Sequence, residues 1–325
     1  MKQVRVEKIT HSYDGVRPAV AELSFHINAG EVLALIGPNG AGKSTSLRIL
    51  ATLQRPDSGE VTWDGRDTWP VRQAVRQRIG FLGDGTGLYP NMTAAGYLRF
   101  FAECYGLDDG AANTRVAELL ATFKLSSKAE ARISDLSKGM RQRLAIARTL
   151  VHGPELLLLD EPADGLDPLG RRQLREILRG VANEGVGIVV SSHILRELDG
   201  FCDAVALIQK GALQVFGPVE EVIDKYEVAR RVHEVSVTKG LQQAIAILSA
   251  HEGLIEEVLP LTRDEQIDPA TADRGKIRVR VRGAENHAAK LLKELVLADV
   301  EVIALTRMRS DLEDVYQSIG RDEVA

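Results

Sequence analysis

The chain has 325 residues, enough for one full core and a second, smaller domain. Lys and Arg total 41 against 46 Asp and Glu, so the net charge of -5 gives no overall positive field to hold nucleic acid, which is not an expected partner. Only Cys104 and Cys202 are present, far apart, which argues against a disulfide framework or a zinc site and favours a reducing, cytoplasmic compartment.

The amino-terminal residues scatter charges where a signal peptide needs an apolar segment, and no run approaches about eighteen apolar residues, so we expect no membrane span. The first predicted strands alternate apolar and polar residues, with a turn signal at Pro56-Asp57-Ser58-Gly59. These strands are Val4–Ile9, Leu23–Ile27 and Val61–Trp63. They predict a small antiparallel sheet beside a larger core.

Four near-continuous apolar runs are typical of strands that a parallel sheet buries on both faces. They are Val32–Ile36, Leu156–Leu159, Ile188–Val190 and Val205–Ile208. Residues Tyr89–Val151 have helical spacing, with an amphipathic helix over Met140–Val151, and predict a helical lobe at about 85–152. The predicted fold class is therefore α/β, with a mixed sheet core, a small antiparallel sheet and a helical lobe.

The pattern changes after Gly217-Pro218. We predict a first domain over 1–220, a linker helix over 221–231, beginning near Val219, and a small α+β accessory domain over 232–325. Its predicted strands are Val232–Val237, Leu254–Leu259, Ile277–Val281 and Val300–Thr306. Its predicted helices are Leu241–Ala250, Glu285–Leu297 and Leu312–Ile319, and Leu261–Gly275 is a predicted loop.

A glycine-rich segment joins the run Val32–Ile36 to a predicted helix at Ser46–Ala51. Its residues are Gly37, Pro38, Asn39, Gly40, Ala41, Gly42, Lys43, Ser44 and Thr45. Glycines let backbone N–H groups and the positive end of the helix converge on phosphate oxygens, while Lys43 adds a mobile ammonium. Ser44 would offer its hydroxyl to Mg2+ that bridges the β- and γ-phosphates. The segment predicts a phosphate cradle.

Acidic side chains end another buried strand, because Asp160 and Glu161 directly follow four leucines. Ligands of open α/β sheets bind at the carboxyl ends of the strands. We expect Asp160 to hold a Mg2+-bound water and Glu161 to act as the general base that polarises the attacking water. His193, at the end of Ile188–Ser192, is expected to position the water or Glu161.

Four further segments carry a specific resemblance to one known family. In order, Leu136–Arg148, Leu156–Pro162, Gly165–Pro168 and Ser191–His193 resemble the signature loop, Walker B strand, D-loop and H-loop of an ATP-binding cassette (ABC) ATPase. The similarity covers about residues 1–220. It implies the ABC-type P-loop ATPase fold, ATP with Mg2+, and ATP hydrolysis. The close spacing disfavours the related recombination and chromosome-organising ATPases, which insert long coiled coils.

The resemblance also implies roles for single residues. Ser137 and Gly139 match the signature residues that cap the γ-phosphate bound by a second copy, so a working site requires a head-to-tail dimer. Tyr13 matches the aromatic residue that stacks on adenine. Asp84 stands where a glutamine is usual and remains a candidate Mg2+ ligand.

Three further positions depart from the common family form: Lys138 and Met140 in the signature, and Asp164 in the D-loop. Lys138 adds positive charge near the expected γ-phosphate or faces solvent. Met140 replaces an amide donor, and Asp164 adds negative charge at the dimer seam. None removes the residues expected to bind phosphate or activate water, so we expect hydrolysis to survive.

The function implied is that of the ATP-hydrolysing subunit of a membrane transporter, held on the inner face of the cell membrane by separate permease subunits. Gly87–Thr93 and Tyr97–Phe101 resemble the surface by which ABC-2 type drug and polymer exporters grip a permease helix, which favours export over import. Phe100 and Phe101 fit either that role or the core of the lobe.

The alternative function is a soluble ABC ATPase in assembly or translation. A single cassette and the net acidity argue against ribosomal RNA as its partner. Arg278, Arg280 and Arg282 alternate with apolar residues and give one strand an arginine face, either solvated beside carboxylates or open to an acidic partner or lipid. The transported substrate and the role of the second domain stay open.

Overall fold

The structure is a computed structural model and describes residues 1–83, 85, 87–193, 200–227, 231–251, 255–261, 273–281 and 286–307. The chain divides into two compact units, Met1–Val219 and Glu220–Ala325. Asp84, the helix predicted at Leu312–Ile319 and most of the loop predicted at Leu261–Gly275 lie outside the described residues. No helix in the described part is both long enough and apolar enough to cross a membrane.

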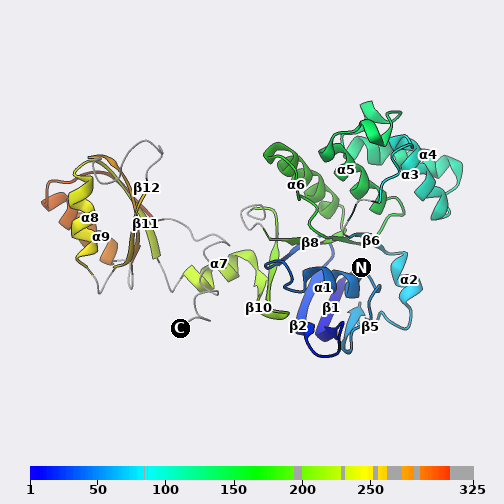
Figure 1. Cartoon of the computed structure of the whole chain (residues 1–325), viewed down its shortest axis with the longest axis horizontal. Coiled ribbons are helices and arrows are strands. Elements are labelled where there is room, and N and C mark those ends of the chain that lie inside the picture. Colours follow the sequence, from blue (N-terminus) through cyan, green and yellow to red (C-terminus); the bar gives the residue numbers. More distant parts are fainter. Residues whose placement is uncertain are drawn as a thin grey trace. The chain divides into compact units, whose positions relative to one another are not determined.

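A ten-stranded mixed sheet organises the first unit, in the order β5-β4-β1-β2-β10-β9-β3-β8-β7-β6 (Figure 1). Its strands are β1 (Gln3–Ser12), β2 (Pro18–Asn28), β3 (Val32–Ile36), β4 (Ser58–Trp63), β5 (Arg66–Asp67), β6 (Ile79–Leu82), β7 (Leu156–Leu159), β8 (Gly187–Ser192), β9 (Ala204–Gln209) and β10 (Ala212–Pro218). Strands β9, β3, β8, β7 and β6 pair in parallel, and every residue of β3, β7 and β8 is buried. The four predicted core strands are confirmed.

The antiparallel part is continuous with that core. Strand β1 pairs with both β2 and β4, as predicted, and β2 meets β10 through a parallel bridge between Ala21 and Ala212. Sequence patterning missed β10 and β6. Strand β10 buries only Val215, so it has little apolar signal. In β6 the apolar pattern is interrupted by Gly80. A Cβ at this position would lie 2.3 Å from the carbonyl oxygen of Thr149, so the strand needs glycine there.

The helices of the first unit are mostly fixed by side-chain caps. They are α1 (Lys43–Leu50), α2 (Arg72–Arg76), α3 (Ala94–Cys104), α4 (Asp109–Thr122), α5 (Lys138–Thr149) and α6 (Pro168–Asn183), with short 3-10 turns at Ser126–Lys128 and Ile133–Asp135. Thr93, Asp108, Ser137 and Asp167 accept a backbone N–H in the first turns of α3, α4, α5 and α6. Helix α5 therefore begins at Lys138, two residues before the predicted start. Helices α3, α4 and α5 gather beyond β6 as the helical lobe (Figure 1).

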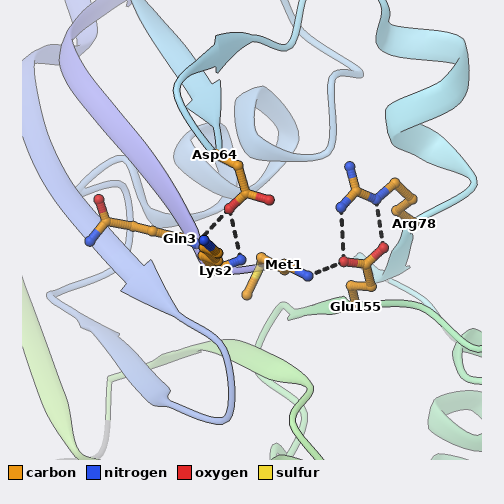
Figure 2. A network of polar contacts seen from close by, with 6 residues as sticks. All are labelled: Met1, Lys2, Gln3, Asp64, Arg78 and Glu155. Atoms are coloured by element: carbon orange, nitrogen blue, oxygen red, sulfur yellow. Dashed lines mark hydrogen bonds and ion pairs between the residues drawn. The ribbon is translucent and has the colours of Figure 1, made fainter.

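A polar network ties the start of β1 to two neighbouring segments (Figure 2). Arg78 donates to both carboxylate oxygens of Glu155 at 2.6 and 2.8 Å, and the Met1 amino group also contacts Glu155. The backbone N–H groups of Lys2 and Gln3 donate to Asp64 at 2.7 and 2.9 Å. The hydrogen bond from Arg78 is the main cause that lowers the pKa of Glu155 to about 2.

The second unit is a four-stranded antiparallel sheet in the order β12-β13-β11-β14, with two helices packed on one face (Figure 1). Its elements are α7 (Val219–Glu227), β11 (Arg231–Lys239), α8 (Leu241–Ser249), β12 (Ile255–Leu261), β13 (Gly275–Val281), α9 (Asn286–Leu297) and β14 (Glu301–Arg307). This order is that of a split βαβ unit. The four predicted strands and the two predicted helices within the described residues are confirmed, whereas α7 ends before Arg231, which already belongs to β11.

The arginine face predicted on β13 is described at Arg278, which is exposed and lies in register with Glu234 of β11. Lys276, on the same face, makes an ion pair with Glu234. Arg282 and the side chain of Arg280 lie outside the described part. A carboxylate among these cations favours the solvated-face interpretation.

Candidate active site

The glycine-rich segment forms the loop between β3 and α1, as predicted. A Cβ on Gly37 would lie 2.2 Å from the carbonyl oxygen of Ile208, and one on Gly42 would lie 2.5 Å from that of Ala19. Gly42 also has a φ of +106°, which an L side chain rarely adopts. The loop therefore follows a path against β9 and β2 that only glycine permits at these positions.

The amino-terminal end of α1 has the features of an anion site. Its N-cap is Gly42, with no side chain to accept the N–H groups of the first turn, and that turn holds no acidic residue. Lys43 is 6% exposed and folds over the loop, where its ammonium donates to the carbonyl oxygens of Gly37 and Pro38 at 2.7 and 3.3 Å. The uncapped N–H groups and the ammonium fit the oxygens of a phosphate group.

The two acidic residues after β7 are joined through a buried serine of β8. The Ser191 hydroxyl donates to Asp160 Oδ1 at 2.7 Å and accepts the backbone N–H of Glu161 at 2.8 Å. Both Ser191 and Asp160 are buried. The Asp160 N–H donates to the carbonyl oxygen of Leu82, which places the carboxyl end of β7 beside that of β6. Sequence reasoning gave Ser191 no role, although it lies two residues before His193.

Glu161 lies between Lys43 of the phosphate loop and His193, the other residue expected to act in catalysis. Its Oε1 is 3.3 Å from Lys43 Nζ and its Oε2 is 3.0 Å from His193 Nδ1. Glu161 has a φ of +46°, which is uncommon for a residue with a side chain and is a form of backbone strain found at functional sites. The hydrogen bond that the Glu161 N–H donates to Ser191 supports this conformation. Lys43, Asp160, Glu161 and His193 thus meet in one site.

Tyr13 lies near the loop without covering it. Its hydroxyl is 3.3 Å from Thr45 Oγ1, and its ring meets His11 edge-on at 4.9 Å between centroids. The side chain is 60% exposed, so its ring has a free face for a flat base. Thr45 itself is buried, whereas Ser44 is partly exposed beside it.

The signature residues lie on the helical lobe. The Ser137 hydroxyl accepts the N–H of Met140 at 3.2 Å and caps α5, while Gly139 approaches Leu166 of the D-loop. Within the described residues, neither Ser137 nor Gly139 makes a hydrogen bond to the residues around the phosphate loop. One chain thus does not assemble all the predicted site residues.

A contact that the sequence did not predict joins the signature to the D-loop. The Lys138 side chain lies against Gly165, where an added Cβ would come within 1.6 Å of its ammonium nitrogen. Gly165 has a φ of +64°, and Arg171 braces the same turn by donating to the Leu166 carbonyl oxygen at 2.8 Å. Lys138 therefore folds onto the D-loop of its own chain.

The phosphate loop, the carboxylates at the ends of buried parallel strands and the mixed sheet define a P-loop ATPase. The family model of the ABC transporter domain matches residues 20–164. The chain is 41% identical over 207 residues to the ABC transporter ATP-binding protein NatA of Bacillus subtilis, covering 63% of this chain and 84% of NatA. The chain therefore belongs to the family of ABC transporter ATP-binding proteins, and it is an ATPase that energises a membrane transporter.

Two other relatives carry more specific names. The linearmycin resistance ATP-binding protein LnrL of Bacillus subtilis is 28% identical over 316 residues, which cover 97% of each chain. The Nod factor export ATP-binding protein I of Burkholderia pseudomallei is 38% identical over 205 residues, covering 63% of this chain and 67% of that protein. The similarity to LnrL thus extends through the second unit.

Solved structures agree with the fold. The structure of an ATP-binding subunit of an ABC transporter has a TM-score of 0.62 and 28% identity, and covers 69% of this chain and 93% of that one. A dimeric bacterial ABC transporter cassette has a TM-score of 0.60 and 26% identity, and the match covers 66% of this chain and 98% of the cassette. The predicted fold class is confirmed.

Proposed function

We propose that two copies of this chain close head to tail around ATP, and that hydrolysis reopens them to drive an exporter built from separate permease subunits at the inner face of the cell membrane. The observation that carries the proposal is the contact of Glu161 with both Lys43 and His193 beside the uncapped end of α1. The names of LnrL and the Nod factor protein, which concern drug resistance and export, support the direction of transport.

The chemistry follows from the placement of each group. The loop Gly37–Gly42, with Lys43 and Thr45, binds the phosphates of ATP, and Tyr13 stacks on the base. Glu161 accepts the proton of the attacking water, and His193 holds the Glu161 carboxylate in place. Ser137 and Gly139 of one chain cap the γ-phosphate bound by the partner, which accounts for their distance from their own loop.

Ser44, Asp160 and Asp84 are the proposed residues around Mg2+. The buried Asp160 carboxylate, oriented by Ser191, fits this role because Mg2+ usually takes one or two carboxylates together with substrate phosphates. Among the described residues no three His, Cys, Asp or Glu side chains form an all-protein metal cluster. When bound, Mg2+ neutralises charge on the phosphate oxygens.

Contact with the permease is proposed at the aromatic cluster of the helical lobe. Phe100 is 42% exposed and Tyr89 is also exposed, and their rings meet edge-on at 6.1 Å. Phe101, by contrast, packs against Tyr97 at 5.1 Å and beneath the Arg148 guanidinium. The proposal therefore gives the two phenylalanines different roles: the exposed ring of Phe100 docks, and Phe101 supports the lobe.

The test is the ATPase rate and the molecular size of the purified chain in Mg-ATP, compared with Glu161→Gln. We expect the variant to lose hydrolysis by about a hundredfold or more and to accumulate as an ATP-dependent dimer, because loss of a general base typically costs 10²–10⁴-fold. Arg132→Gln, an exposed change on the lobe, is the control. A Glu161→Gln variant that hydrolyses ATP at the wild-type rate would overturn the assignment.

A further inference from the structure

His11 is a buried histidine that no step of the proposed hydrolysis uses. It lies near the end of β1, is 5% exposed, and comes two residues before Tyr13. Its Nε2 is buried, and within the described residues this nitrogen has no hydrogen-bond partner. Burying an unpaired polar atom costs free energy, which an apolar side chain of similar size would avoid. Packing alone therefore does not account for an imidazole at this position.

The other nitrogen of His11 fixes the imidazole in place. Nδ1 lies 3.2 Å from Asp57 Oδ1, and an ionised carboxylate only accepts hydrogen bonds, so Nδ1 is the donor. Asp57 Oδ2 also accepts the backbone N–H of Ser12 at 2.8 Å, and the Asp57 N–H donates to the carbonyl oxygen of Thr10 at 2.8 Å. Asp57 thus ties the turn before β4 to the end of β1, and it holds the imidazole where it meets Tyr13.

The Tyr13 side chain is exposed but is contacted at two points. The imidazole of His11 meets its ring at 4.9 Å between centroids, with the two planes at 82°. Its hydroxyl lies 3.3 Å from Oγ1 of Thr45, in the first turn of α1. The loop that follows is fixed by Asp14, whose Oδ1 accepts two backbone N–H groups of the same loop at 2.8 and 2.9 Å. These contacts restrict the orientation of the Tyr13 ring.

We infer that His11 is a positioning residue for Tyr13 and thereby raises the affinity of the site for ATP. The inference rests on the proposed function, in which Tyr13 stacks on the base. An exposed side chain loses rotational freedom when a base stacks on it, and this loss opposes binding. The edge-on contact with His11 limits that freedom in advance, and Asp57 keeps the imidazole from turning away. Because His11 is buried, it acts through Tyr13 and not by contact with the nucleotide.

The first test compares two ligands of the full chain by titration calorimetry. Mg-ADP carries the base and is not hydrolysed, whereas magnesium tripolyphosphate has phosphates and no base. His11→Asn keeps an amide donor for Asp57 but removes the ring, and it should weaken ADP binding about fivefold, the order expected for ordering one side chain. Tripolyphosphate should bind the wild type and the variant equally.

The matched control is His26→Asn on the neighbouring strand β2. His26 also meets an aromatic ring edge-on, at 5.0 Å from Phe216 between centroids. It pairs with Arg5 at the other end of β1 from His11. We therefore expect His26→Asn to bind ADP and tripolyphosphate as the wild type does.

The second test separates positioning from a purely structural role. Tyr13→Ala should weaken ADP binding about tenfold through the loss of stacking, and in that background His11→Asn should have no further effect. His11→Phe, which keeps an aromatic ring beside Tyr13, should bind ADP within about twofold of the wild type. In steady-state hydrolysis, His11→Asn should raise KM for ATP about fivefold and leave kcat within about twofold, because Lys43 and Glu161 are untouched.

Unfolding midpoints show whether each variant is folded, and His11→Leu, which buries no polar atom, serves if His11→Asn unfolds. The inference is overturned if the folded variant binds ADP as the wild type does, or if tripolyphosphate binding falls as much as ADP binding. It is also overturned if the losses of His11→Asn and Tyr13→Ala multiply in the double variant. Unchanged ADP binding by Tyr13→Ala would overturn the proposed base contact and the inference with it. A loss in Tyr13→Ala without one in His11→Asn overturns the inference alone.

Discussion

The backbone N–H of Glu161 donates to the Ser191 hydroxyl at 2.8 Å, and the same hydroxyl donates to Asp160. One buried side chain thus holds the Asp160 carboxylate and the Glu161 backbone after β7. Because Glu161 has a positive φ, its strained conformation depends on that hydrogen bond, which is worth about 1 kcal/mol in stability and leaves a partly buried donor unsatisfied when it is removed.

Ser191→Ala should therefore lower the ATPase turnover about 10- to 100-fold, because Glu161 and Asp160 lose their common support. Affinity for nucleotide should change less than about threefold, since Ser191 does not contact the phosphate loop. Steady-state hydrolysis and equilibrium nucleotide binding measure the two quantities. Ser127→Ala, at an exposed serine of the helical lobe, is the control, and equal losses in both variants would contradict a specific role for Ser191.

The contact of Lys138 with Gly165 predicts non-additive substitutions. Gly165→Ala displaces the Lys138 ammonium and strains a residue at φ +64°, while Lys138→Ala removes the contact from the other side. Each single change should lower the ATPase rate about three- to tenfold, because the D-loop and signature both face the partner's nucleotide in the proposed dimer. The double variant should be no slower than Gly165→Ala alone.

The measurement is a double-mutant cycle on the ATPase rate, with Lys128→Ala, an exposed lysine on the same lobe, as control. If the rate losses of Gly165→Ala and Lys138→Ala multiply in the double variant, the two residues act independently and the contact has no role in turnover.

The pKa of Glu155 predicts how stability changes with pH. The folded protein holds this pKa at about 2, below the ordinary value of 4.5, chiefly through the hydrogen bond from Arg78. The stabilisation is therefore fully present above about pH 4.5 and is lost as the pH falls toward 2. Because both side chains are more than a third exposed, solvent screening limits it to about 1 kcal/mol.

Urea unfolding measures the free energy of unfolding of the first unit. At pH 6 this free energy should be about 1 kcal/mol higher for the wild type than for Glu155→Gln. The difference should shrink below pH 4.5. Glu103→Gln, which breaks the exposed ion pair with Arg99, should change the unfolding free energy by a few tenths of a kcal/mol at most. A wild-type advantage that stays constant down to pH 3 would show that Glu155 acts through its shape and not its charge.

Local signals explain what the sequence predicted. Each of these signals is a short continuous segment: the apolar runs of β3, β7 and β8, and the glycine-rich loop. Ligand sites of such sheets lie at the ends of the strands. These signals were sufficient to place Lys43, Asp160, Glu161 and His193 in one site. Roles given to Asp84, Ser137 and Gly139 remain predictions, because Asp84 is outside the described residues and the signature residues are expected to act on a second chain.

Contacts between distant segments explain what the sequence did not predict. Ser191 is one of two serines at the end of β8, and only the pairing of β7 with β8 shows which of them reaches Asp160. The contact of Lys138 with Gly165 depends on how the helical lobe meets the D-loop. Strand β10 has one buried residue, so its place between β2 and β9 follows from pairing and not from apolar periodicity.

Substitutions of Phe100 and Phe101 should have different effects: the first should weaken coupling to the permease, and the second should lower stability. Phe101→Ala should lower the free energy of unfolding by about 2 kcal/mol, since its half-buried ring loses contact with Tyr97 and Arg148. Phe100→Ala should cost less than about 1 kcal/mol and leave the ATPase rate of the free chain unchanged. With the permease in membranes, however, Phe100→Ala should reduce stimulation of the ATPase about fivefold or more. Urea unfolding and permease-stimulated hydrolysis measure the two effects, with Tyr105→Ala as an exposed aromatic control on the same helix end. Full stimulation with Phe100→Ala would remove this ring from the docking surface and leave the aromatic cluster as a part of the lobe's packing.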